Sequence, residues 1–146
     1  MSTERWITEE PLDLNALLDE TADPACGAVV AFGGLVREQN EGRAVSGMTY
    51  DAHVTMAART LEALEQEVLE RFDVRRCRIV HRIGALKLEE ASVWVVVRSP
   101  HRRAAFEAGQ YAIDTLKERL PVWKEEHYVE GESRHLDGTP LAPDET

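Results

Sequence analysis

Two lysines flank a proline in the stretch TLKERLPVWKEEH, at residues 115–127. The chain has 17 Lys and Arg residues, of which only Lys87, Lys117 and Lys124 are lysines, so two of the three lie close to Pro121. Arginine stays a cation in proteins, whereas an amine can give up its proton and act as a nucleophile or proton carrier. The pair therefore indicates a catalytic site. A lysine that complements a helix dipole, followed by a solvated strand lysine, is the alternative that stays open.

Other charged side chains gather where one element is expected to give way to the next. His101 and Arg102 stand at a strand-to-helix junction, and Arg37 follows a glycine-containing strand. A helix N-terminus offers free N–H groups and a partial positive charge, so this pattern suits a phosphate or carboxylate ligand, and solvated charges at a helix start are an equally open alternative. Glu125 and Glu126, next to Lys124, either exchange protons with it or form a solvated strand face.

Two amphipathic helices are expected to position these residues. Between residues 54 and 72 apolar residues recur every three or four positions, which predicts a helix with one buried face. The expected core residues of this helix are Ala57, Leu61, Leu64, Val68 and Phe72. A second helix is expected over 102–120, ended by Pro121. Its expected buried residues are Phe106, Ile113, Leu116 and Leu120.

The remaining elements predict an α+β fold in one domain, residues 1–146. Strands are expected at 5–8, 26–36, 48–53, 76–84, 91–99 and 122–130, and a short helix at 11–20. The polar segment 37–47 is expected to be a mobile loop, 84–90 a connection, and 131–146 a loosely ordered tail. Because strands and helices are mixed without a strict βαβ rhythm, we expect a mixed or antiparallel sheet with two main helices on one face.

Composition narrows the function. The net charge of −10 argues against nucleic-acid binding, which needs a basic face. No membrane span or secretory signal is visible, so a cytoplasmic location is expected. Cys26 and Cys77 are expected to be free thiols in strands. The five histidines show no metal-ligand spacing, so no metal site is expected.

Four stretches agree in residue type and spacing with one known family. They are AVVAFGGLVR (28–37), HRIGAL (81–86), HRRAAFEAGQYAIDTLKERLPVWKEE (101–126) and, more loosely, YDAHVTMAARTLEALEQEV (50–68). In these stretches the sequence resembles the MoaE family, the large catalytic subunit of molybdopterin synthase, over about residues 26–130.

The resemblance implies an α/β-hammerhead-like fold and a sulfurtransferase of molybdenum cofactor biosynthesis. Such an enzyme converts cyclic pyranopterin monophosphate (precursor Z) to molybdopterin by inserting the two sulfurs of the dithiolene. The sulfur arrives as a thiocarboxylate on the C-terminal Gly-Gly of a small ubiquitin-like subunit of the MoaD type. The implied assembly is a homodimer within a heterotetramer, with no metal or other cofactor for this step.

The resemblance also implies roles for individual residues. Lys117 and Lys124 match the two active-site lysines of the family, and His101 and Arg102 match its anion-binding pair. Substrate binding is further implied for Leu35, Val36, Arg37, Glu125 and Glu126. The sequence departs from the family pattern at Leu35, where many relatives carry a basic residue, and at KLEEAS (87–92), where the turn usually contains Pro and Gly.

Two other functions remain open from the sequence. The same basic cluster would suit a non-catalytic acidic scaffold that binds a ubiquitin-like protein and an anionic pterin or nucleotide. A phosphate-ester enzyme is a weaker possibility, because the sequence shows neither an evident nucleophile for it nor a metal site.

Overall fold

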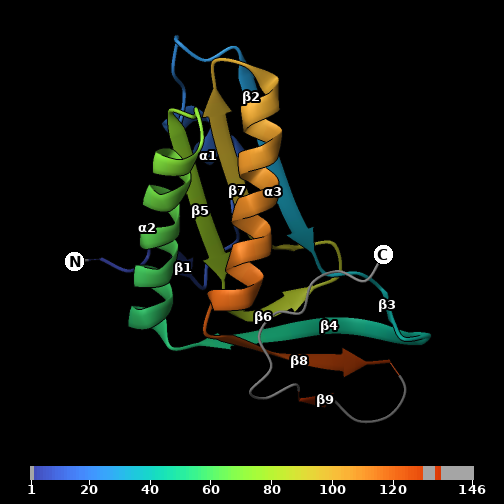
Figure 1. Cartoon of the computed structure of the whole chain (residues 1–146). Helices are drawn as coiled ribbons and strands as arrows, with labels where there is room; N and C mark the ends of the chain where they lie inside the picture. Colours follow the sequence, from blue (N-terminus) through green and yellow to red (C-terminus); the bar gives the residue numbers. More distant parts are fainter. Residues whose placement is uncertain (1, 130–133, 136–146) are drawn as a thin grey trace.

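A four-stranded sheet forms the centre of the part that the computed structural model describes, residues 2–129 and 134–135 (Figure 1). Its strands are β1 (Ile7–Thr8), β2 (Ala28–Leu35), β5 (Arg76–Arg82) and β7 (Ala91–Ser99), in the order β1-β5-β7-β2. β1 pairs with β5 in parallel, whereas β7 is antiparallel to both β5 and β2. The sheet is therefore mixed, as expected.

A second sheet lies at one end of the first, at the bottom of Figure 1. The long strand β4 (Arg43–Ala52) pairs with β8 (Val122–Tyr128) and with β6 (Gly84–Lys87). β3 (Gln39–Asn40) pairs with the start of β4, and β9 (Arg134–His135) pairs with β8. This sheet carries the strand that contains Lys124.

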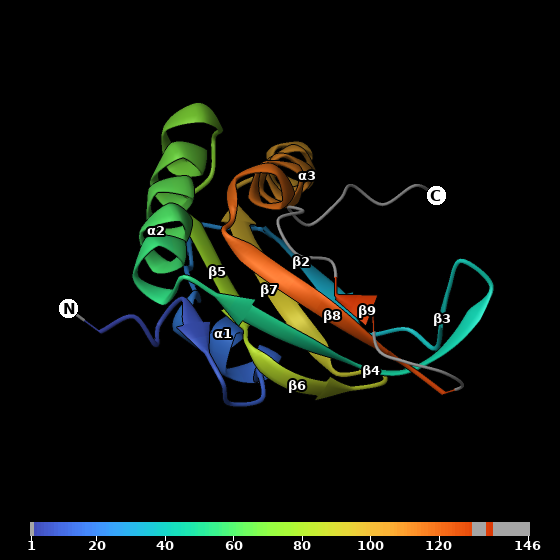
Figure 2. The same cartoon turned by 90° about the horizontal axis from the view of Figure 1, so that it is seen from below.

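Helices cover both faces of the four-stranded sheet (Figure 2). α2 (Val54–Arg71) and α3 (Arg102–Arg119) lie on one face, and the short α1 (Leu14–Glu20) lies on the other. Because successive strand side chains point to opposite faces, Val93, Val95 and Val97 of β7 join the core under α2 and α3, while Val96 packs with Leu17 of α1. The prediction of two main helices on one face is confirmed.

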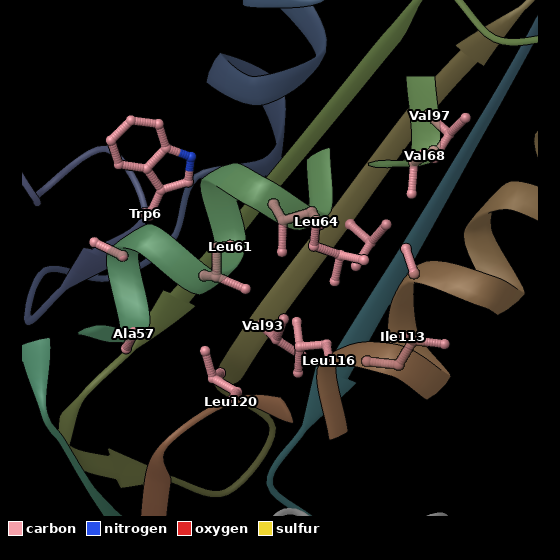
Figure 3. Packing of buried hydrophobic residues seen from close by; sticks show 14 of the residues in the cluster. Trp6, Ala57, Leu61, Leu64, Val68, Val93, Val97, Ile113, Leu116 and Leu120 are labelled. Atoms are coloured by element: carbon pink, nitrogen blue, oxygen red, sulfur yellow. The ribbon is translucent and has the colours of Figure 1, made fainter. Parts of the chain in front are cut away.

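Figure 3 shows the main core between α2, α3 and the sheet. The expected core residues of α2 are buried, except that Phe72 at the C-cap is only partly covered. The prediction that Phe106 of α3 is buried is wrong, because this side chain is 63% exposed. The buried stripe of α3 passes through Ala105, Ala108 and Ala112 to Leu116, and Phe106 is turned away from it by about 100°, the rotation per helical residue.

The prediction of a mobile loop over 37–47 is also wrong. Residues 39–52 form the β3–β4 hairpin, whose turn residues Glu41 and Gly42 have φ values of 52° and 78°. Two left-handed residues in succession are typical of the tight turns that join antiparallel strands. The strand expected at 48–53 therefore begins earlier, at Arg43.

Two smaller expectations also need correction, and one lies outside the described residues. The connection expected over 84–90 contains β6, because residues 84–87 pair with β4. Cys26 precedes β2 instead of lying in a strand, while Cys77 lies in β5; both are free thiols. The tail expected over 131–146 falls outside the described residues, apart from β9. Within the described residues, no helix is both long and apolar enough to cross a membrane.

Candidate functional site

The turn at Pro121 brings Lys117 and Lys124 to the same end of the molecule. Lys117 is in the last turn of α3, and β8 begins at Val122, three residues after α3 ends at Arg119. The turn is held by hydrogen bonds from the Val122 N–H to the Leu120 carbonyl (2.9 Å) and from the His53 N–H to the Pro121 carbonyl (3.3 Å). The sharp reversal predicted at the proline is therefore present.

The side of α3 on which Lys117 lies follows from the helical repeat. Residues four apart share one side of a helix, so Lys117 lies on the same side as Ile113 and Gly109. Gly109 packs so closely against β2 that an added Cβ would lie 3.3 Å from a methyl group of Val30. Lys117 therefore lies on the flank of α3 that faces β2, and it is partly exposed.

Lys124 lies on the inner face of β8. It shares this face with Val122, which is 1% exposed and belongs to the main core, and with Glu126, which is 2% exposed, because side chains two residues apart on a strand point the same way. Within the described part of the chain, the ammonium groups of Lys117 and Lys124 have no hydrogen bond or ion pair. Among these residues, no side chain or backbone group therefore engages either amine.

The segment Leu35–Arg37 leaves β2 at this same end of the sheet. Leu35, 57% exposed, pairs with Ala91 at the start of β7. Val36 is buried, and its backbone donates to the Glu90 carbonyl (3.0 Å) and accepts from the Glu89 N–H (2.7 Å). Val36 therefore anchors the segment, whereas Leu35 and Arg37 present their side chains to solvent.

The two glutamates that follow Lys124 face opposite sides of β8. Glu125 is partly exposed and lies 3.8 Å from His127. The buried carboxylate of Glu126 accepts hydrogen bonds from Asn40 Nδ2 at both oxygens (2.8 and 2.7 Å) and from the Tyr128 hydroxyl (2.6 Å). The last of these raises the pKa of Tyr128. Sequence reasoning missed Asn40, because nothing in the local pattern marks it.

His101 and Arg102 lie at the opposite end of α3, at the top of Figure 1. His101 is the N-cap residue, but its side chain makes no capping hydrogen bond, and both residues are exposed. With a rise of 1.5 Å per residue, Arg102 and Lys117 are about 22 Å apart along the helix axis. One copy of the chain therefore does not bring the expected anion-binding pair to the lysines.

A partly buried tyrosine that sequence reasoning did not assign to the site lies next to Lys124. Tyr50 of β4 is the register partner of Lys124, and its ring meets the edge of His81 with 5.1 Å between centroids. Burial raises the pKa of Tyr50 and lowers that of His81 to about 4. His81 Nδ1 lies 2.8 Å from the Arg82 carbonyl, so the neutral ring is held as a donor at this atom.

A cavity of about 310 Å³ opens on the α1 side of the sheet. Its lining includes Leu12, Leu35, Arg82 and Trp94 but neither lysine. Among the residues that the structure describes, no cluster of three or more His, Cys, Asp or Glu side chains is arranged to hold a metal ion. The amines of Lys117 and Lys124 and the guanidinium of Arg37 lie outside the lining of this cavity.

Comparison with known proteins gives consistent matches over most of the chain. Residues 7–119 match the family model described as MoaE protein. The molybdopterin synthase catalytic subunit of Halalkalibacterium halodurans is 38% identical over 133 residues, covering 90% of this chain and 85% of that protein. The molybdopterin synthase catalytic subunit of Staphylococcus carnosus is 40% identical over 125 residues, covering 86% and 83%.

Solved structures agree in fold. Molybdopterin synthase from Staphylococcus aureus superposes with a TM-score of 0.84 and 35% identity, covering 92% of this chain and 97% of that chain. A chain from the complex of subunits 1 and 2 of the molybdopterin-converting factor from Helicobacter pylori gives a TM-score of 0.75 at 21% identity, covering 93% of each chain. The second likeness concerns the fold alone.

Proposed function

The chain belongs to the MoaE protein family, and from this premise we propose that it is the catalytic subunit of a molybdopterin synthase. It transfers sulfur from the thiocarboxylated C-terminus of a small ubiquitin-like subunit to cyclic pyranopterin monophosphate, and so forms the molybdopterin dithiolene. The relatives are named catalytic subunits, which supports an enzyme over a non-catalytic scaffold.

The observation that carries the proposal is the position of the two amines. Lys117 and Lys124 approach one end of the molecule from a helix end and a strand start, and within the described chain neither ammonium group is paired. Arg37 leaves β2 at the same end. A site with two amines and a guanidinium suits a phosphate-bearing substrate and a reaction that moves protons.

In the mechanism that we propose, Arg37, Lys117 and Lys124 have different roles. Arg37 holds the cyclic phosphate of the substrate, because a guanidinium positions such a group as well as attracting it. Lys117 supplies or accepts protons as sulfur replaces oxygen on the pterin side chain, or acts as a nucleophilic amine when the acyl group is released. Lys124 stabilises negative charge beside it, and Leu35 and Glu125 border the substrate.

His101 and Arg102 join this site from a second copy of the chain. β2 is at the edge of its sheet and exposes Val29 and Phe32, while Phe106 is exposed on the flank of α3 that also carries Lys117. An exposed apolar edge strand is a template for pairing with another chain. Two copies paired antiparallel along β2 would set the Arg37 end of one beside the α3 N-terminus of the other.

The second partner of the site is the sulfur carrier. The name catalytic subunit, carried by the relatives, implies a further subunit in those enzymes. The proposed assembly is a homodimer of this chain with one MoaD-type carrier bound to each copy, so that each C-terminal Gly-Gly reaches a pair of lysines. The whole chain, 1–146, is proposed to be a single MoaE-like domain. Cytoplasmic location also remains a proposal, which cell fractionation would test.

The proposed function is tested by reconstitution. The purified chain is mixed with a thiocarboxylated carrier and cyclic pyranopterin monophosphate, and molybdopterin is measured. Dithiolene product is expected with the thiocarboxylated carrier, and none with a carrier that ends in an ordinary carboxylate. Binding of both partners without product would instead identify the chain as a scaffold.

A further inference from the structure

We propose that Asn40 is a positioning residue for the sulfur transfer: its hydrogen bonds to Glu126 hold Arg37 beside the two lysines. This inference rests on the proposed function and adds to it a residue that touches neither substrate nor reacting atoms. It also changes the role expected for Glu126: instead of binding substrate, its carboxylate accepts the hydrogen bonds of Asn40.

The contact between Asn40 and Glu126 is partly buried and involves both carboxylate oxygens. Asn40 Nδ2 lies 2.8 Å from one carboxylate oxygen and 2.7 Å from the other, and the Tyr128 hydroxyl donates to the second oxygen at 2.6 Å. Glu126 is only 2% exposed. Both oxygens are therefore engaged inside the protein, and hydrogen bonds to a charged group are stronger than those between neutral groups.

Arg37 lies on a short span that is held at both ends. At one end the backbone of Val36 is bonded to Glu89 and Glu90, and at the other the side chain of Asn40 is bonded to Glu126. Two residues separate Arg37 from Asn40, so the chain between their Cα atoms reaches at most about 10 Å. A backbone bond from Val45 N–H to the Glu38 carbonyl (2.7 Å) closes the hairpin behind this span.

The anchor connects this span to the strand that carries Lys124. Lys124 and Glu126 share one face of β8, and their Cα atoms are about 7 Å apart at the rise of an extended strand. The hairpin itself has little apolar surface to bury: Gln39 and residues 41–44 are exposed. The Asn40–Glu126 contact therefore adds a polar anchor to the β4–β8 pairing and to the Arg43 guanidinium over the Tyr128 ring (3.8 Å to the centroid), which also hold the hairpin.

The first test is the Asn40→Ala variant, assayed with carrier and cyclic pyranopterin monophosphate. Loss of hydrogen bonds to a buried carboxylate is expected to raise the KM for the pterin about tenfold to a hundredfold, with a smaller change in kcat. Ser46→Ala is the matched control, because Ser46 of β4 also donates to β8, at the His127 carbonyl (3.1 Å), without touching Glu126. Its KM is expected to stay within about twofold of wild type.

A double-mutant cycle separates positioning from a general loss of structure. If Asn40 acts by placing Arg37, adding Asn40→Ala to an Arg37→Ala chain raises the KM little further. Glu126→Gln keeps one acceptor oxygen, and it is expected to give a smaller rise in KM than Asn40→Ala. This variant also serves if the alanine variant does not fold.

Amide hydrogen exchange gives a readout that needs no activity. Residues 38–45 should exchange faster in the Asn40→Ala variant, while the core positions of α2 remain as protected as in wild type. Unchanged exchange at 38–45, a wild-type KM, or a full further rise in the Arg37→Ala background would each overturn the inference. Absence of product from the wild-type chain would instead overturn the proposed function, so the two failures are distinguishable.

Discussion

At the scale of single residues, the two amines are chemically distinct from the many arginines around them. Both are partly exposed, both lie on elements held by a tight turn, and neither ammonium is paired inside the described chain. Removing either side chain therefore leaves no buried partner unsatisfied, and activity can be separated from stability.

Lys117→Ala is expected to lower molybdopterin formation about a hundredfold to ten-thousandfold, the usual contribution of a positioned acid or base. Folding and carrier binding should be unaffected, as judged by thermal unfolding and a binding titration. Lys117→Arg keeps the charge but not the transferable proton, so full activity in that variant would reduce the lysine to a simple cation. Lys87→Ala, at the exposed third lysine, is the control and should be fully active.

His81 gives the protein a pH-dependent stability. Its pKa is about 4 in the folded chain and 6.5 ordinarily, so the folded state binds fewer protons between these values. The free energy of unfolding should therefore fall as the pH drops from 6.5 to 4, by on the order of 3 kcal/mol at 1.36 kcal/mol per unit. In His81→Asn this dependence should flatten in urea titrations; an unchanged profile would exclude His81 as its source.

The residues of the site differ in how far sequence alone could find them. The lysines could be predicted because a scarce residue type recurs around a proline, which is visible in the chain itself. Asn40 could not, because the contact on which its proposed role rests is with Glu126, 86 residues away in sequence. Glu126 was predicted to bind substrate, but its neighbours in sequence do not show that it is buried against Asn40.

At the scale of secondary-structure elements, the long helices follow from the sequence and the hairpin does not. The apolar period of α2 and α3 is nearly independent of context, so their bounds were predicted to within one residue. The residues of β3 and the start of β4 are polar, and only Val45 and Gly47 are buried there. These residues are strands because they pair with one another and with β8. A short stretch of sequence does not show this pairing, because the partner strand lies far away along the chain.

Glu65 of α2 joins the segment ahead of β1 to β5 through one buried carboxyl group. It accepts from Trp6 Nε1 (2.9 Å), ahead of β1, and from the backbone N–H of Ile79 in β5 (2.8 Å). Glu65→Ala should lower the free energy of unfolding by on the order of 2–5 kcal/mol, because two buried donors lose their acceptor. Chemical denaturation measures this, and the exposed neighbour in Gln66→Ala should change it by less than about 0.5 kcal/mol.

The effect of Glu65 should also depend on pH. Burial raises the pKa of this carboxyl above its usual value of 4.5. Its contribution to stability is then fully present below pH 4.5 and is lost as the pH rises through the higher folded value. The difference between wild type and Glu65→Ala should therefore be larger at pH 5 than at pH 8, and the opposite trend would contradict the assignment.

At the scale of the whole molecule, the proposed site is divided between two copies of the chain. The distance between His101 and Lys117 could be calculated from the helix expected over 102–120, because the length of a helix follows from its number of residues. The resemblance grouped these residues into one site, and the fold shows that one chain cannot do so. What the sequence lacked was the position of β2 at the sheet edge, which depends on how four separate strands pair.

Mixed dimers test this division. Lys117→Ala and Arg102→Ala chains, each inactive alone, are combined and allowed to exchange subunits. Half of the dimers then contain one of each, and each of these has one intact site, so about one quarter of wild-type activity should return. If each chain held a complete site, mixing would restore nothing.

The length of α3 has a consequence for how such proteins can change over time. Arg102 is the first residue of one uninterrupted helix of 18 residues, and Lys117 lies in its last turn. Losing a single residue inside it would rotate one end against the other by about 100° and shorten the helix by about 1.5 Å. In a two-fold assembly such a change would misplace residues in both pockets at once. We therefore expect insertions and deletions to be tolerated in surface turns and eliminated by selection from this helix.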